Sequence, residues 1–320
     1  MKEKRANGST KKARAGTSVG AGKTGRSSLP TVEEAARISV SRTAKVLIAG
    51  KFVRSESGRT FTRFDADGRF WANVPLCSRK DARDAVVAAR AGHEAWEKQS
   101  AALRGQIIYR FAEMLEGRRG QFVEELTRMG RSQLEASEHF DQSVDRVLWY
   151  AGWADKFSQV VSSSNPVNGP FDSSSAITPI GVVVSVAPAG GGLLGIVEMI
   201  CAAVVNGNAV VMVVEEEAMS AVTLGEVLSV SDFPVGVVNI LTGRRKELVL
   251  PLAMHMGVDA LDLGDLDDSE PSLAADAAVA ATGNLKRTVR TAGQAWDREP
   301  SLMRMQALTE MRTVWQTVGQ

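Results

Sequence analysis

The sequence predicts an α/β fold in which a mostly helical N-terminal section packs on a doubly wound parallel sheet. From residue 181 onward, short apolar runs rich in β-branched residues alternate with helix-like segments, which is typical of a parallel sheet with helices on both faces. Before residue 160, apolar residues instead recur at helical spacing after a small β-rich start. The chain of 320 residues, with 44% hydrophobic and 23% charged residues, has an ordinary globular composition.

The parallel sheet is expected to contain four strands joined by helices. The expected strands are residues 181–186, 209–214, 237–241 and 258–263. The expected helices are residues 193–205, 218–230 and 244–256. Each strand is a short, mostly apolar run, and Gly or Asn-Gly punctuation separates the elements.

The N-terminal section is expected to begin with two strand-like patches, at residues 46–48 and 60–62. Helices should follow from Ser78 and over residues 102–116, 121–134 and 137–159. Ser78 and Asp81 have the spacing of a capping box at the start of the first of these helices. Residues 162–175 are rich in Ser, Asn, Pro and Gly, and this composition predicts a crossing loop.

Three regions are expected along the chain: a basic disordered arm (1–44), a mostly helical section (45–165) and a cofactor-type domain with a C-terminal tail (166–320). Residues 1–30 hold eight Lys or Arg and one Glu, so they carry +7, whereas the whole chain carries +1. A basic, Gly/Ser/Thr-rich segment is typical of a solvated tail. Contact with nucleic acid is the alternative for this arm, and we expect it to be unlikely.

The two cysteines, Cys77 and Cys201, exclude a disulfide scaffold and suit a reducing cytoplasm. The three histidines are far apart in sequence, so no metal site is expected. No apolar run reaches the roughly 18 residues that a membrane helix needs, so no membrane partner is expected.

Six short segments follow a shared family pattern. They are residues 48–52 (IAGKF), 83–90 with the following Trp96, 150–156 (YAGWADK), 179–183 (PIGVV), 206–211 (NGNAVV) and 234–243 (PVGVVNILTG). Together they resemble the aldehyde dehydrogenase superfamily, which implies an N-terminal section on a Rossmann-like sheet. Residues 284–287 and 311–315 further resemble short, degenerate members, including the second repeat of two-repeat aldehyde dehydrogenases.

The positions that bind substrate and cofactor in the family differ here. Gly190 stands where active members have the Asn that helps hold the oxyanion, so that side-chain donor is missing. Val213-Val214 replaces the Lys-Pro pair whose Lys reaches the adenosine ribose. Asp265 follows Gly264 where active members have Ser beside the diphosphate, and a carboxylate there repels that anion.

A vestigial dinucleotide site is the most that the resemblance implies. Its candidate residues are Pro188, Gly190, Glu216, Gly243 and Gly264. Because Glu215 and Glu217 flank Glu216, it is open which of the three takes the family's acidic position. The three glycines 190–192 either present N–H groups to an anion or mark a cavity where larger residues once stood. No cofactor is expected, and NAD or NADP is the class to consider if one binds.

The family's catalytic cysteine has no counterpart in this chain, nor does the general-base Glu of its Glu-Leu-Gly-Gly block. No catalytic residue is therefore expected, and the catalytic domain is interpreted as missing. The leading hypothesis is an inactive regulatory or structural subunit, in an oligomer with a full-length aldehyde dehydrogenase or with itself. The alternative is an NAD(P)-dependent oxidoreductase acting on aldehydes, with an active site completed by a partner chain.

Overall fold

The structure is a computed structural model that describes residues 42–291 and 295–318. The expected basic arm (1–44) lies largely outside the described residues. Its last part is described, and Arg42 donates a hydrogen bond to Thr223 Oγ1 at 2.9 Å. Residues 41–320 form one compact unit. The expected domain boundary between residues 165 and 166 falls between two strands that pair with each other. The compact unit therefore continues across this boundary.

Five helices form the N-terminal section: α1 (Arg79–Glu97), α2 (Ala101–Glu116), α3 (Arg119–Arg128), α4 (Gln133–Trp153) and α5 (Phe157–Val161). The expected capping box is confirmed, because Ser78 Oγ accepts from the Asp81 amide while the Asp81 carboxylate accepts from the Ser78 amide. Helix α3 ends at Arg128, earlier than expected, and α4 begins after a second capping box made by Ser132 and Glu135.

Small antiparallel hairpins precede these helices: β1 (Val46–Ile48) pairs with β2 (Lys51–Val53), and β3 (Thr60–Phe64) pairs with β4 (Phe70–Pro75). The two expected strand patches fall within β1 and β3. The turn between β1 and β2 needs left-handed backbone at Ala49 and Gly50, with φ of 51° and 69°.

Within the described residues, the largest sheet is parallel and has the order β11-β10-β7-β8-β9. Its strands are β7 (Val182–Val186), β8 (Ala209–Val214), β9 (Val238–Thr242), β10 (Ala260–Asp262) and β11 (Arg287–Val289). The four expected strands are confirmed to within two residues at each end, the usual uncertainty of such bounds. The fifth, β11, was not expected because its three residues, two of them polar, lack an apolar run.

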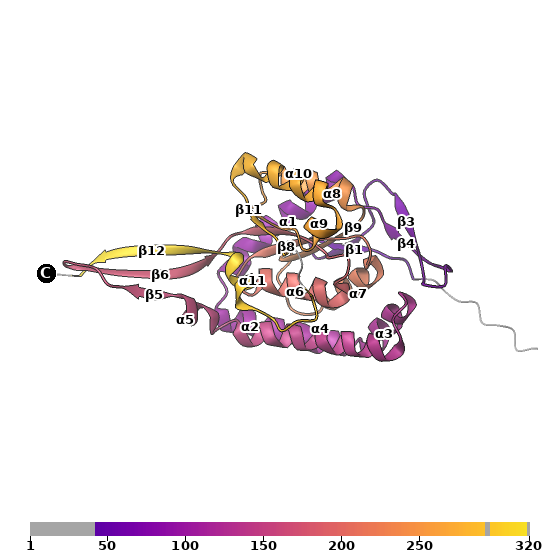
Figure 1. The fold of residues 1–320 in the computed structure, drawn as a ribbon, viewed down its shortest axis with the longest axis horizontal. Helices are drawn as coiled ribbons and strands as arrows, with labels where there is room; N and C mark the ends of the chain where they lie inside the picture. Colours follow the sequence, from indigo (N-terminus) through magenta and orange to yellow (C-terminus); the bar gives the residue numbers. More distant parts are fainter. Residues whose placement is uncertain (1–41, 292–294, 319–320) are drawn as a thin grey trace, which may run out of the picture. The chain divides into compact units, whose positions relative to one another are not determined.

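Helices cover both faces of this sheet, as Figure 1 shows. They are α1, α6 (Gly192–Val204), α7 (Ala218–Leu228), α8 (Arg245–Ala253), α9 (Leu266–Ser269) and α10 (Pro271–Ala281). Alternate strand residues enter different cores, since successive side chains of a strand point to opposite faces. Val182 and Val184 pack with α1 and α8, whereas Val183 packs in the core that contains α4 and α6.

A separate three-stranded antiparallel sheet, which we call the arm, has the order β12-β6-β5. Its strands are β5 (Ser163–Asn165), β6 (Phe171–Pro179) and β12 (Thr309–Thr317). Figure 1 shows them running together away from the parallel sheet. The expected crossing loop at 162–175 is therefore wrong. The serines of β6 are held in a strand by nine register pairs with β12, whose residues lie 130 or more positions later in the chain.

The tail carries more structure than the sequence indicated. After α10, a 3-10 turn (Thr282–Asn284) leads into β11, and α11 (Leu302–Ala307) leads into β12. Only residues 290–308 lie between β11 and β12. The chain therefore passes from the edge of the parallel sheet to the arm through a short connection.

Candidate functional site

The five residues of the expected site all lie at the carboxyl edge of the parallel sheet. Pro188 and Gly190 follow β7, Glu216 follows β8, Gly243 follows β9 and Gly264 follows β10. The strand order reverses between β7 and β10, because β8 and β9 continue on one side of β7 and β10 lies on the other. Doubly wound proteins bind ligands at such a switch point.

Asp265 lies at the switch point, on the β10 side. Its Oδ2 accepts a hydrogen bond from the Ala189 amide at 2.8 Å. The approach depends on Gly264, whose φ is +58° and whose Cβ, if present, would lie 2.6 Å from the Val186 carbonyl oxygen. The Asp265 carboxylate thus already occupies one loop amide, and its repulsion of an anion stays a prediction.

Arg245 lies under the same edge and was not found by the sequence reasoning. Its side chain is 3% exposed and belongs to the first residue of α8. Its guanidinium donates to the Ala187 carbonyl oxygen at 3.0 Å and to both Glu216 oxygens at 3.3 Å. Nothing in the sequence separates this residue from the neighbouring Arg244, whose side chain is 67% exposed.

The three consecutive glutamates have different partners, and which of them takes the family's acidic position stays a prediction. Glu215 accepts from the Arg245 amide at 2.8 Å, and Glu216 pairs with the Arg245 guanidinium. Glu217 is buried. Burial, and then the neighbouring Glu216 carboxylate, raise the pKa of Glu217 to about 7. The expected candidate Glu216 is thus the partner of an internal arginine.

Val213 is fully buried in the core shared with α1 and α8. It offers no polar group at the end of β8, as expected from its replacement of a lysine. The conformation of Gly243, with φ of 157°, brings the chain against Cys77, whose amide nitrogen would lie 3.4 Å from a Cβ at that position.

Of the three glycines after β7, Gly192 meets His139 of α4 and Arg131, which precedes α4, whereas a Cβ on Gly190 would meet no atom within 4 Å. A Cβ on Gly192 would lie 2.7 Å from His139 Nε2 and 3.0 Å from an Arg131 nitrogen. The Leu194 amide donates to His139 Nε2 at 3.2 Å. Burial, and then the Arg131 guanidinium, lower the pKa of His139 to about 4, so the imidazole is neutral and able to accept this bond. His139 thus packs on Gly192, while the choice between an anion site and a cavity at these glycines stays a prediction.

The two thiols are both buried. Burial, and then the Asp81 carboxylate, raise the pKa of Cys77 to about 12. Burial holds the pKa of Cys201 well above its usual range. A nucleophilic cysteine must be accessible and ionised, so neither thiol is equipped for attack on an aldehyde.

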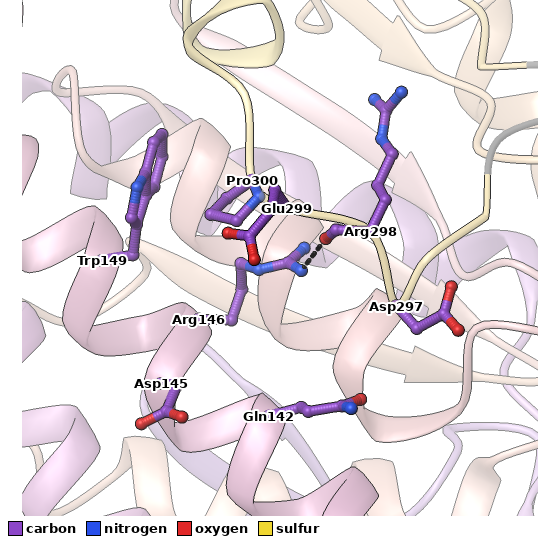
Figure 2. A pocket seen from close by; sticks show the side chains of 8 residues that line it. All are labelled: Gln142, Asp145, Arg146, Trp149, Asp297, Arg298, Glu299 and Pro300. Carbon is purple, nitrogen blue, oxygen red and sulfur yellow. Dashed lines mark hydrogen bonds between the residues drawn. The ribbon is translucent and has the colours of Figure 1, made fainter.

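A cavity of about 270 Å³ opens beside α4, and Figure 2 shows its lining. The lining residues are Gln142, Asp145, Arg146, Trp149, Asp297, Arg298, Glu299 and Pro300. The Arg146 guanidinium donates to the Arg298 carbonyl oxygen and forms a buried ion pair with Glu198. Arg304 forms further buried ion pairs with Glu198 and Asp262. The charges beside this cavity thus serve to hold residues 296–304 against α4 and α6.

Among the described residues, no group of three or more His, Cys, Asp or Glu side chains could hold a metal ion. In the same part of the chain, no helix has the length and apolar content needed to cross a membrane.

Residues 52–264 match the model of the family described as "Aldehyde dehydrogenase family". The matched range is more than half of the chain, and it contains strands β7 to β10 with the loops that follow β7, β8 and β9. The chain belongs to the aldehyde dehydrogenase family. The family membership and α/β fold inferred from the six short segments are thereby confirmed.

Curated relatives match only part of their own length. Retinal dehydrogenase 2 of Gallus gallus is 32% identical over 224 residues, which cover 68% of this chain and 43% of that protein. The mitochondrial aldehyde dehydrogenase family 2 member B4 of Arabidopsis thaliana is 31% identical over 262 residues, covering 78% of this chain and 46% of that protein. The chain therefore spans less than half the length of these aldehyde dehydrogenases.

Solved aldehyde dehydrogenase structures share the fold. The apo form of indole-3-acetaldehyde dehydrogenase has a TM-score of 0.73 at 24% identity, covering 79% of this chain and 58% of that one. The NAD+ complex of the aldehyde dehydrogenase from Bacillus cereus has a TM-score of 0.71 at 22% identity, covering 77% and 50%. The dinucleotide in that complex is a property of the Bacillus protein.

Proposed function

We propose that this chain is a non-catalytic member of the aldehyde dehydrogenase family that acts as a subunit bound to a full-length aldehyde dehydrogenase. One observation carries the proposal. The arm has a nine-pair register between β6 and β12, although only residues 290–308 connect the parallel sheet to β12. The chain thus keeps the element by which, on the resemblance, family members reach a neighbouring subunit. The connection is too short to form a separate catalytic domain.

The state of the thiols supports the absence of aldehyde oxidation. The reaction needs a thiolate to attack the aldehyde before hydride transfer. Cys201 is fully buried inside α6, and Cys77 is fully buried between β4 and α1. Gly190 adds no side-chain amide for an oxyanion, a loss worth about 2.7–4 kcal/mol in enzymes that depend on such a donor.

We also propose that the carboxyl edge of the parallel sheet holds no dinucleotide, because its side chains do not fit one. Asp265 places a carboxylate on the Ala189 amide, where a diphosphate would need a donor. Arg245 and Glu216 pair with each other at the ends of β7 and β8. Val213 contributes only apolar surface. No step of a reaction is therefore assigned to NAD or NADP here.

The test mixes the purified chain with a full-length aldehyde dehydrogenase from the same genome. We expect a complex whose mass, measured by light scattering after size exclusion, is the sum of both components, and a change in the partner's turnover. The chain alone should reduce neither NAD nor NADP with aldehydes. No complex with any full-length relative from that genome would overturn the subunit proposal.

Two further results distinguish our proposal from the alternative, in which a partner chain completes the active site. Under that alternative, an inactive Cys-to-Ser variant of the full-length partner would still give NADH when mixed with this chain, and Cys201→Ser would abolish that signal. Under our proposal neither effect occurs, because Cys201 makes no contact with substrate. Turnover that depends on Cys201 would overturn the non-catalytic assignment.

A further inference from the structure

A cavity of about 350 Å³ lies beside the hairpin of β3 and β4 and shares no lining residue with the candidate site at the parallel sheet. Its walls come from residues 42–44, from the turn between β2 and β3, and from β3 and β4 themselves. Ligand pockets commonly have volumes of about 300–1,000 Å³. Among the described residues, the lining includes three arginines, Arg42, Arg54 and Arg59, and no Asp or Glu. The cavity is therefore suited to an anion.

Arg54 and Arg59 are the two arginines that are free to bind a ligand. Within residues 42–291 and 295–318, the exposed Arg54 side chain makes no ion pair or hydrogen bond. Arg59 pairs with Glu247 at 3.4 Å, and both of these side chains are exposed. An exposed ion pair is weak, so an anion in the cavity can take the place of Glu247. Arg42 is instead bonded to Thr223, with 2.9 Å between Nη2 and Oγ1.

Neutral polar groups of the lining are also available to an anion. Asn73 Oδ1 accepts a hydrogen bond from Thr62 Oγ1 at 3.0 Å, which leaves the NH₂ group of Asn73 as a donor. The hydroxyl groups of Thr43 and Thr60 have no partner in the described part of the chain. Hydroxyl and amide groups can both donate hydrogen bonds to the oxygens of an anion. The cavity therefore gathers donors from separate segments, without a carboxylate in its lining to compete for them.

The turn that carries Arg54 and Arg59 is held in place by a buried carboxylate. Asp81, which closes the capping box of α1, accepts a hydrogen bond from Ser55 Oγ at 2.7 Å. Inside the turn, the Gly58 amide donates to the Ser55 carbonyl oxygen at 2.9 Å, and Gly58 adopts a φ of +67° that favours glycine. These bonds fix the backbone of the turn before a ligand arrives. A preorganised loop loses little conformational entropy on binding.

We propose that this cavity binds a small phosphate monoester, with its phosphate between Arg54 and Arg59 and its organic group against Phe70. The Arg guanidinium is a planar fork of N–H donors that matches phosphate oxygens. A phosphate monoester carries about −1.5 to −2 at pH 7, which balances two arginines, whereas a carboxylate balances one. Phe70 lines the cavity with 57% of its surface exposed, so it offers apolar contact. Neither the arm nor the carboxyl edge of the parallel sheet takes part, so this binding is independent of the proposed function.

The test titrates the full chain with phenyl phosphate in a calorimeter, with inorganic phosphate and phenol as comparison ligands. Phenyl phosphate should bind one molecule per chain with a dissociation constant below about 1 mM. Inorganic phosphate lacks the ring and phenol lacks the dianion, so each should bind more weakly than phenyl phosphate. Absence of saturable phenyl phosphate binding, or equally tight binding of either comparison ligand, would overturn the proposal.

Arg54→Gln removes the free guanidinium and should weaken phenyl phosphate binding at least about tenfold, because hydrogen bonds to a charged group are lost. Arg54→Lys keeps the charge but lacks the planar fork, so its affinity should lie between those of Arg54→Gln and the unchanged chain. Since Arg54 has no side-chain partner among the described residues, both variants should keep the melting temperature of the unchanged chain.

Arg69→Gln is the matched control. It removes the same charge between β3 and β4, where the Arg69 side chain is 77% exposed and does not line the cavity, so it should bind phenyl phosphate as the unchanged chain does. The basic residues 1–30 are present in every variant, and an anion bound there would bind all of them alike. Equal affinity of Arg54→Gln and the unchanged chain would therefore overturn the proposal, as would an equal loss in Arg69→Gln. Displacement of phenyl phosphate by a lower concentration of a single-stranded oligonucleotide would assign the cavity to nucleic acid and overturn it too.

Discussion

The Asp265 carboxylate accepts a hydrogen bond from the Ala189 amide, with 2.8 Å between Oδ2 and N. These residues follow β10 and β7, the two strands between which the strand order reverses. A doubly wound protein uses amides at this place to bind phosphate groups. Here the Asp265 carboxylate already accepts from one of these amides. We therefore expect weak binding of a dinucleotide.

Unchanged protein should bind NAD with a dissociation constant above about 1 mM, a binding free energy weaker than roughly −4 kcal/mol. Asp265→Ser removes the competing carboxylate and restores the residue that the resemblance assigns to active members, so it should strengthen binding. Asp276→Ser, on the exposed side of α10, removes the same charge elsewhere and should change nothing. Calorimetric titration measures all three. Micromolar affinity of the unchanged chain would show that Asp265 does not block the site.

Arg245→Ala should lower the free energy of unfolding by about 1.5–3 kcal/mol, the range for hydrogen bonds to charged groups, because Glu216 keeps 41% of its side chain exposed and is solvated when unpaired. The change leaves the Ala187 carbonyl oxygen and the Glu216 carboxylate without their donor. Arg244→Ala removes the same type of side chain from an exposed position and should stay within about 0.5 kcal/mol of the original protein. Urea unfolding compares the two, and equal losses would contradict the burial of Arg245.

His139 should make stability fall as the solution is acidified. Its pKa is about 4 in the folded chain and about 6.5 when unfolded. The unfolded state thus binds more protons between these values, and stability is lost as the pH falls from 6.5 to 4, by at most about 3 kcal/mol.

The variant His139→Gln isolates this effect, because the Gln oxygen can still accept from the Leu194 amide while the titration is removed. Burial raises the pKa of Glu125 and of Glu217 to about 7, which gives a pH dependence of the opposite sign. Both carboxyls are present in both proteins and cancel in the difference. Chemical unfolding at pH 7 and pH 4.5 measures that difference, and parallel curves for the two proteins would contradict the prediction.

Deleting residues 1–30 should leave the melting temperature of the chain unchanged, because this segment has almost no apolar residues to bury. The deletion stops before Arg42, whose guanidinium bonds to Thr223 and lies 3.6 Å from Glu125. Arg42→Ala in the full chain is the companion variant, and it should lower stability because it removes these contacts. A drop of several degrees on deletion would show that residues 1–30 stabilise the folded chain.

Local patterns in the sequence were sufficient to locate four strands of the parallel sheet. The run 209–214 is apolar throughout and the run 182–186 is apolar except for Ser185, because helices cover both faces of the sheet. The capping box of α1 was equally readable, since Ser78 and Asp81 interact within one helical turn. Placing five candidate residues at one edge also followed from the sequence, because each comes directly after a parallel strand.

The three-stranded arm and the side-chain contacts at the carboxyl edge of the parallel sheet could be determined only from the tertiary structure. Strand β6 has the composition of a loop, and its strand conformation depends on β12, a partner distant in sequence. Arg244 and Arg245 are adjacent and identical, yet one is exposed and the other buried, because only Arg245 reaches the Ala187 carbonyl oxygen and Glu216. His139 meets the glycine turn through the packing of α4 on α6. Such contacts join segments far apart in the chain, and a local pattern carries no information about them.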